Sequence, residues 1–275
     1  MEFTTAVSVV RLGKASYDQR HIIQKYWTVL KAWFDKGETQ ILVTGHSGAG
    51  KSVLTGQLHG SARDLYYEAP SESQTVEVEA ITIGEWTKLV RVLPGQKGRR
   101  TAGEIDSLQE NESLDGVIHV VDFGYVAPRD PVVAQALVEE DGIVTLQELR
   151  ERNLKLEVED LKDLIASIRR LHHQHKRPKW LIIAVNKVDL YPTERSMALA
   201  HYHSKGTSPF SKALRELQQE IGENNLAIYV VEVCSHEADF IWNGFNVPSA
   251  LAPREDNTIL RNFSSVLSTV VAKHA

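Results

Sequence analysis

The residues with the clearest chemistry lie at 41–52, where an aliphatic run leads directly into a glycine-rich turn, a lysine and a serine. The segment matches Gly-x-x-x-x-Gly-Lys-Ser, the pattern of a phosphate-binding loop, with a predicted strand before it and a predicted helix after it. Glycines let the backbone wrap closely around a polyphosphate, and the N–H groups at the start of the helix point toward it. We expect Lys51 to reach the β- and γ-phosphates and the Ser52 hydroxyl to bind Mg²⁺. The residues predicted to hold a nucleoside triphosphate here are Gly45, His46, Ser47, Gly48, Ala49, Gly50, Lys51 and Ser52.

A second candidate site follows the aliphatic segment 180–185, where the chain reads Asn186-Lys187-Val188-Asp189. A carboxylate at Asp189 can accept hydrogen bonds from both the ring N–H and the exocyclic amine of guanine. Adenine offers neither donor in that geometry, so ATP would leave a buried charge unpaired and be rejected. This tetrapeptide after such a strand resembles the guanine-specificity motif of the GTPase superfamily. The resemblance implies that the stem of Lys187 lies over the base and that Asn186 ties the base loop to the phosphate loop.

Strands that alternate with helices would position both motifs. Hydrophobic periodicity predicts strands at 76–83, 88–93, 116–123, 181–185 and 226–233, and helices at 53–66 and 257–273. A turn at Gly84 would make the first two strands an antiparallel pair at the sheet edge. The motifs together resemble a TRAFAC-type small GTPase domain over residues 38–275, with no subfamily identified. The fold class expected is therefore α/β, a three-layer, doubly wound and mostly parallel sheet that binds ligands at the C-terminal ends of its strands.

The chain departs from the family at the third GTPase motif, Asp-x-x-Gly. Here the sequence reads Val92-Leu93-Pro94-Gly95-Gln96, so valine replaces the aspartate that orients Mg²⁺. Loss of this carboxylate would weaken the hold on the metal. Either another acid compensates, with Asp122 the nearest candidate, or hydrolysis is slow. The resemblance implies that Gly95 binds the γ-phosphate and that Gln96 orients water, although Gln96 can equally be an ordinary loop residue.

Three further residues are carried over from the family by position. Thr75, before the strand at 76–83, is the candidate for a second Mg²⁺ ligand. Ser235, after the strand at 226–233, is the candidate for a contact with the guanine base. In the basic loop 96–103, Arg99 or Arg100 could act on the transferred phosphoryl group, or the loop could simply be solvated.

Two segments extend the minimal domain. Residues 1–37 include an amphipathic helix at about 18–35, which would pack on the flank of the domain or dock a partner. The second is an insertion at about 124–158, with helices at 144–152 and 157–171, and insertions often carry recognition. Histidines at 172–175 and 201–203 lack the acidic or cysteine companions of a metal site, so a basic helix terminus explains them better.

Composition and the absence of targeting motifs indicate the compartment and the kinds of partner to expect. The 275 residues carry a net charge of −5, which gives no sign of nucleic-acid binding. A single cysteine, Cys234, suits a reducing compartment and a packed strand end. No signal sequence, membrane span or lipid-anchor motif is recognised, so we expect a cytoplasmic protein without a membrane anchor.

These features predict a GTP-binding switch, with Mg²⁺ as cofactor and Gln96 and Lys51 as the catalytic residues. It would slowly hydrolyse GTP to GDP and signal to a protein partner through the switch loops or the insertion. The alternative is a non-catalytic GTP-binding module of a larger complex, which the valine at position 92 favours and Gln96 opposes.

Overall fold

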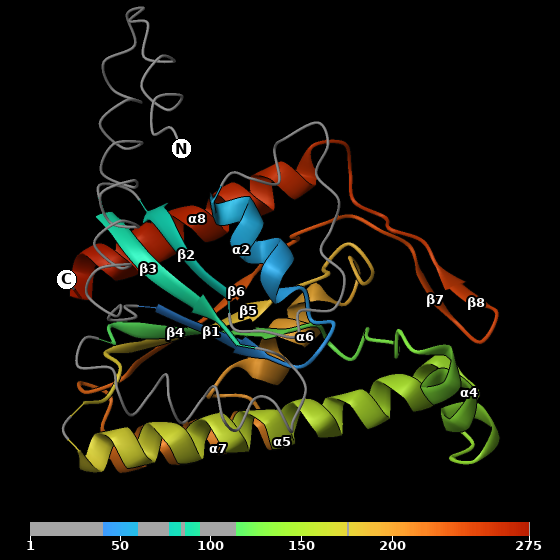
Figure 1. The fold of residues 1–275 in the computed structure, drawn as a ribbon, viewed down its shortest axis with the longest axis horizontal. Helices are drawn as coiled ribbons and strands as arrows, with labels where there is room; N and C mark the ends of the chain where they lie inside the picture. The colour runs from blue at the N-terminus through green and yellow to red at the C-terminus, as the bar shows by residue number, and fades with distance from the viewer. Residues whose placement is uncertain (1–40, 60–76, 84–85, 94–113, 175, 275) are drawn as a thin grey trace, which may run out of the picture.

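A six-stranded sheet forms the centre of the molecule (Figure 1). The computed structural model describes residues 41–59, 77–83, 86–93, 114–174 and 176–274. The strands are β1 (Ile41–Gly45), β2 (Glu77–Ile83), β3 (Trp86–Val92), β4 (Gly116–Val121), β5 (Trp180–Val185) and β6 (Ala227–Glu232). Their spatial order is β2-β3-β1-β4-β5-β6, with every pair parallel except the antiparallel edge pair β2–β3. The predicted α/β fold, the mostly parallel sheet and the antiparallel edge are confirmed.

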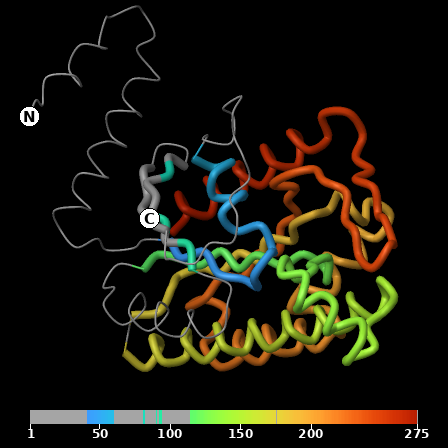
Figure 2. The backbone as a smooth tube through the Cα atoms, turned by 45° about the vertical axis from the view of Figure 1, so that its right-hand side comes forward, coloured from blue at the N-terminus to red at the C-terminus, as the bar shows by residue number. Residues whose placement is uncertain are grey.

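Helices cover both faces of this sheet, as the two views show (Figures 1 and 2). On one face lie α2 (Lys51–His59) and α8 (Glu255–His274), whose apolar side chains pack with alternate residues of the central strands. On the other face lie α5 (Leu146–His173), α6 (Arg195–Tyr202) and α7 (Pro209–Ile221). Strands β1, β4 and β5 are buried along their whole length, because a parallel sheet covered on both faces exposes neither set of side chains.

One long helix, α5, replaces the two helices predicted at 144–152 and 157–171, so that prediction is wrong. The predicted boundary of the insertion at 158 falls inside α5 and is not a structural boundary. Thr145 starts the helix with a capping box, in which its side chain and that of Glu148 each accept from the other residue's backbone N–H. The buried face of the helix includes the polar residues Asn153 and Glu157, which interrupt the apolar stripe and made the sequence look like two helices.

A small lobe, which the sequence did not predict, lies at one end of the sheet (Figure 1). It consists of α4 (Pro131–Glu139) and a hairpin of β7 (Phe240–Trp242) and β8 (Phe245–Val247). Asn243 and Gly244 both have positive φ, as a tight hairpin turn requires. Leu137, Leu149 and Trp242 form the lobe's own buried cluster.

The predicted N-terminal extension at 1–37 lies outside the described residues. Within the part of the chain that the structure describes, no helix is long and apolar enough to cross a bilayer.

Candidate functional site

The phosphate-binding loop connects β1 to α2 and depends on its glycines. Gly45, Gly48 and Gly50 all have φ between 82° and 135°, where other residues are strained. A Cβ on Gly50 would lie 2.4 Å from Asn186 Nδ2. Lys51 Nζ donates to the carbonyls of Gly45 and His46, both at 3.0 Å, so its ammonium lies over the mouth of the loop. The loop therefore has the shape and the cation that a polyphosphate requires.

Asn186 joins the base loop to the phosphate loop, as the resemblance implies. Its Nδ2 donates to the carbonyl of Ala49 at 2.8 Å and to Ser235 Oγ at 2.9 Å. Its Oδ1 accepts from the Ser235 backbone N–H at 3.0 Å, and its carbonyl accepts from the Tyr191 hydroxyl. Because Asn186 is buried, these contacts connect the ends of β1, β5 and β6 in one hydrogen-bonded unit.

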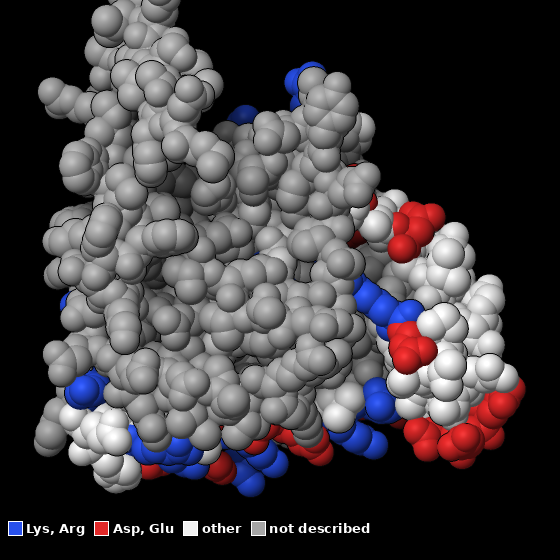
Figure 3. Space-filling model, viewed as in Figure 1, with Lys and Arg blue, Asp and Glu red and all other residues white. Residues whose placement is uncertain are grey.

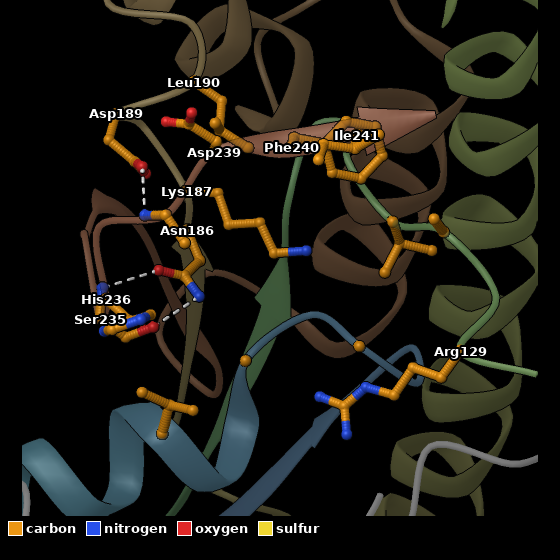
Figure 4. A pocket seen from close by; sticks show the side chains of 16 residues that line it. Arg129, Asn186, Lys187, Asp189, Leu190, Ser235, His236, Asp239, Phe240 and Ile241 are labelled. Carbon is orange, nitrogen blue, oxygen red and sulfur yellow. Dashed lines mark hydrogen bonds between the residues drawn. The ribbon is translucent and has the colours of Figure 1, made fainter. Parts of the chain in front are cut away.

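The carboxylate of Asp189 borders a cavity of about 370 Å³ between the phosphate loop and the base loop. Asp189 is buried and accepts from the backbone N–H of Ala238 and from the thiol of Cys234. Burial, followed by the nearby Asp189, raises the pKa of Cys234, so the thiol stays protonated and packed. Figure 4 shows Asn186, Lys187 and Asp189 around this cavity, with Ser235 and His236 beside them. The two motifs, 135 residues apart between Lys51 and Asn186, meet at one site.

Lys187 is oriented by Asp122, the acid considered above as a candidate to compensate for Val92. Its Nζ lies 2.9 Å from Asp122 Oδ2 and also donates to the carbonyl of Tyr125. Asp122 directly follows β4 and is buried. Its charge is therefore engaged with the base loop, which argues against Asp122 as the substitute for the missing aspartate of the metal site.

A polar face of α5 holds the loop that follows β4. Glu157 Oε1 accepts from the backbone N–H groups of Asp122 and Gly124, both at 3.2 Å, and Glu157 Oε2 accepts from the Tyr202 hydroxyl. Asn153 Nδ2 donates to the carbonyls of Gly124 and Val126 at 2.9 and 2.7 Å. Burial, with the charge of Asp122 second, raises the pKa of Glu157 to about 8. These buried polar groups position one wall of the cavity.

Several residues that line the cavity were missed by sequence reasoning, among them Phe240, Ile241 and Arg129. Phe240 and Ile241 of the hairpin form an apolar wall, and Arg129 enters from the loop between β4 and α4. Figure 4 shows the Arg129 guanidinium on the phosphate-loop side of the cavity. No hydrogen bond or ion pair engages Arg129 within the described part of the chain. Only the Asn243-Gly244 dipeptide, a strong hairpin signal, could have revealed the apolar wall.

The metal side of the site is partly described. Ser52 lies in the first turn of α2, where its hydroxyl can serve as a protein ligand while phosphate oxygens and water complete a Mg²⁺ shell. Val92 is 1% exposed and packs in the apolar cluster shared with Val43 and Leu54. Thr75, Gly95 and Gln96, with Arg99 and Arg100, lie outside the described residues. Among the side chains that the structure describes, no three acids, histidines or cysteines gather as a metal site.

The strand order, with a phosphate-binding loop after the first strand of the sheet, defines the fold of a small GTPase-like P-loop domain. The solved structure of the mammalian SRP receptor aligns with 84% of this chain and 99% of its own, at 16% identity and a TM-score of 0.50. This likeness supports the fold.

Two other solved structures are also similar to this chain. A chain of the signal recognition particle receptor SRb-GTP/SRX complex from Chaetomium thermophilum aligns over 74% of the present chain and 93% of its own length. The identity is 18% and the TM-score is 0.44. The Arl6 BBS3 small GTPase from Trypanosoma brucei, with a bound nucleotide analogue, aligns over 87% of the present chain and 100% of the Arl6 chain. The identity is 14% and the TM-score is 0.40. No family model and no curated protein matches the sequence.

Proposed function

We propose that this protein is a GTP-binding switch that slowly hydrolyses GTP to GDP and phosphate and signals to a protein partner. The observation that carries the proposal is the Asn186 Nδ2 bond to the Ala49 carbonyl, which fixes the base-reading loop against the phosphate-binding loop. A nucleotide whose phosphates lie on Gly48 and Gly50 would place its base against Asp189.

Each part of the cavity has a role in this proposal. Lys51 would bind the β- and γ-phosphates and Ser52 would bind Mg²⁺. The carboxylate of Asp189 would accept from the guanine N–H groups, with the stem of Lys187 along one face of the base. Because the Ser235 N–H already donates to Asn186, Ser235 would support the base loop through Asn186, and the next residue, His236, would face the base.

Nucleotide specificity tests the proposal. GTP and GDP should bind at least about tenfold tighter than ATP, a difference of about 1.4 kcal/mol. Asp189→Asn should transfer the preference from guanine to xanthine nucleotides, because the amide presents an N–H where xanthine carries a carbonyl. A calorimetric titration measures both. Equal affinity of the wild type for GTP and ATP, or no gain for xanthosine triphosphate in the variant, would refute guanine recognition.

Slow hydrolysis follows from the apolar surroundings of Val92. Phosphoryl transfer depends on a metal that neutralises charge on the γ-phosphate. With valine in the buried position and Asp122 paired with Lys187, that metal would lack its usual supporting carboxylate among the residues that the structure describes. We therefore expect weak Mg²⁺ binding and low turnover without a partner.

The same observation favours a second candidate, a GTP-binding module without catalysis that belongs to a larger complex. Single-turnover phosphate release with and without Mg²⁺ separates the two. Slow, Mg²⁺-dependent release supports the switch, whereas tightly bound GTP with no release supports the module. Fast release by the wild type without a partner would contradict this account of metal handling.

A further inference from the structure

Exposed apolar side chains gather on the small lobe beside the nucleotide cavity. Among the described residues, six large hydrophobic side chains are exposed, and Met197 is the one that lies elsewhere. The other five are Val132, Val133, Val144, Ile241 and Phe245. Exposed apolar side chains that gather on one part of a surface mark an interaction site more often than scattered ones do.

A groove runs between α4 and the hairpin. It has a volume of about 400 Å³ and is lined from α4 by Gln135 and Glu139 and from the hairpin by Ile241 and Trp242. Val132 lies on the same stripe of α4, because positions i, i+3 and i+7 share a helix face. We call these five residues the α4–hairpin surface.

The α4–hairpin surface is held in shape from within. Leu137 of α4 packs against Trp242 of the hairpin and Leu149 of α5. Asn243 Nδ2 donates to the carbonyl of Val144 at 3.1 Å, which ties the hairpin turn to the segment after α4. The groove is therefore part of a packed unit.

One side of this surface, along residues 130–148, is acidic. Residues 130–148 contain five acids, Asp130, Glu139, Glu140, Asp141 and Glu148, and no lysine or arginine. Glu139, Glu140 and Asp141 are exposed at the end of α4. Figure 3 shows acidic side chains gathered below a largely uncharged area at this end of the molecule. Such a rim repels another acidic surface and attracts cations.

We propose that the α4–hairpin surface binds a partner protein through an amphipathic segment, with apolar anchors in the groove and lysines or arginines against the acidic rim. A second copy of this chain would bring two acidic rims together, and an anionic membrane would be repelled by them. The proposal rests on the proposed function and gives its partner a surface and a chemistry.

The surface shares a wall with the nucleotide cavity. Ala127 and Ile241 line both the groove and that cavity. A nucleotide that packs against Ile241 would therefore fix the hairpin in one position before the partner binds. Because linkage is reciprocal, GTP should tighten partner binding and the partner should tighten GTP binding by the same factor.

Designed peptides test this surface. The probe is a helical peptide with leucine at positions i, i+3, i+4 and i+7 and lysine elsewhere, and its matched control has glutamate in place of lysine. The lysine peptide should bind the full chain at least about tenfold tighter than the glutamate peptide. Binding is measured by titration with and without GTP, and GTP should increase it.

Two variants should each weaken the lysine peptide about tenfold, one by removing an apolar contact and one by reversing a rim charge. Val132→Ser removes the exposed apolar side chain in the first turn of α4 without adding a charge, and serine is tolerated there, so the fold is retained. Glu139→Lys reverses the charge of the rim. Matched controls are Met197→Ser, an exposed apolar site elsewhere, and Glu223→Lys, an exposed acid elsewhere.

The outcomes separate this inference from the proposed function. Equal affinity for the two peptides, or an equal loss of peptide affinity in the control variants, would refute binding at the α4–hairpin surface. Concentration-dependent dimers that Val132→Ser dissociates, or binding to anionic vesicles that the same variant abolishes, also overturn it by identifying another occupant. Val132 does not line the nucleotide cavity, so Val132→Ser should titrate with GTP as the wild type does. Failure of the wild type to bind GTP would refute the proposed function. The peptide titration without GTP would still show whether the α4–hairpin surface binds a partner.

Discussion

At the scale of single residues, the site depends on close approach between two loops. The bond from Asn186 to the Ala49 carbonyl is possible because residue 50 has no side chain. Asn186 then uses its remaining amide contacts on Ser235, so one buried residue fixes three segments of the chain. The motif residues therefore hold the loops together as well as lining the proposed nucleotide site.

Gly50→Ala tests this connection. The added Cβ would lie 2.4 Å from Asn186 Nδ2 on a backbone with φ of 96°, so Asn186 must move and its bond to Ala49 is lost. We expect GTP affinity to fall at least about tenfold. Gly142→Ala is the control, since Gly142 also has positive φ but open space around it. Both variants should lose about 1–2 kcal/mol of stability from the strained backbone, and normal GTP binding by Gly50→Ala would contradict the role of the Asn186 link.

At the scale of elements, the loop between β4 and α4 supplies a second cation beside Lys51 of the phosphate loop. Lys51 donates to the phosphate loop's own carbonyls and Lys187 is paired with Asp122, whereas Arg129 projects into the cavity. A guanidinium near a phosphate chain forms charge-assisted hydrogen bonds.

Arg129→Ala should therefore weaken GTP and GDP about tenfold and leave guanosine, which has no phosphate, unaffected. The exposed Arg261→Ala is the matched control for loss of one positive charge. Titrations with the three ligands decide the point. Equal weakening of guanosine would show that Arg129 acts on the base or on the fold.

Helix α5 holds that same loop through a buried acid, and this makes stability depend on pH. The folded-state pKa of Glu157 is raised to about 8, above its ordinary value of 4.5. Between these values the folded protein binds more protons than the unfolded chain, so stability falls as pH rises, by up to about 1.4 kcal/mol per pH unit. The contribution is fully present below about pH 4.5 and is lost once pH passes about 8.

Glu157→Gln should flatten this dependence, because the amide stays neutral and its oxygen can still accept from the Asp122 and Gly124 N–H groups. Urea unfolding from about pH 5 to about pH 8.5 measures the slope. Glu151→Gln, at an exposed site of the same helix, should keep the wild-type slope. An unchanged slope in Glu157→Gln would show that Glu157 is ionised throughout.

The elements also show what sequence could and could not predict. Local signals were sufficient for the sheet, because aliphatic runs such as 41–45 and 180–185 are buried on both faces. They failed on α5, where Asn153 and Glu157 are polar yet buried, since their partners are backbone groups of a distant loop. For the same reason the sequence did not predict the pairing of Asp122 with Lys187, which lies 65 positions away. Hydrogen bonds between remote segments leave no periodic trace in the sequence.

At the scale of the whole molecule, the proposed ligand would be in contact with most of the segments that close the sheet. The cavity is bordered by the loops after β1, β4, β5 and β6 and by the hairpin. These loops connect helices on both faces of the sheet, so a bound nucleotide would restrain both layers at once. Ligand binding should then appear as global stabilisation, because only the folded chain presents this combination of loops.

Thermal unfolding tests this coupling in the intact chain. GTP at about a hundred times its dissociation constant should add about 2.7 kcal/mol to the free energy of unfolding, which raises the midpoint of a domain of this size by roughly 5–10 °C. The same concentration of ATP should give no comparable rise, because Asp189 finds no donor pair on adenine. Asp189→Asn should lose the GTP effect and acquire one with xanthosine triphosphate, and Lys51→Ala should lose both. Equal shifts with GTP and ATP in the wild type would mean that the phosphate loop alone holds the ligand and that the base loop, although bonded to it through Asn186, does not read the base.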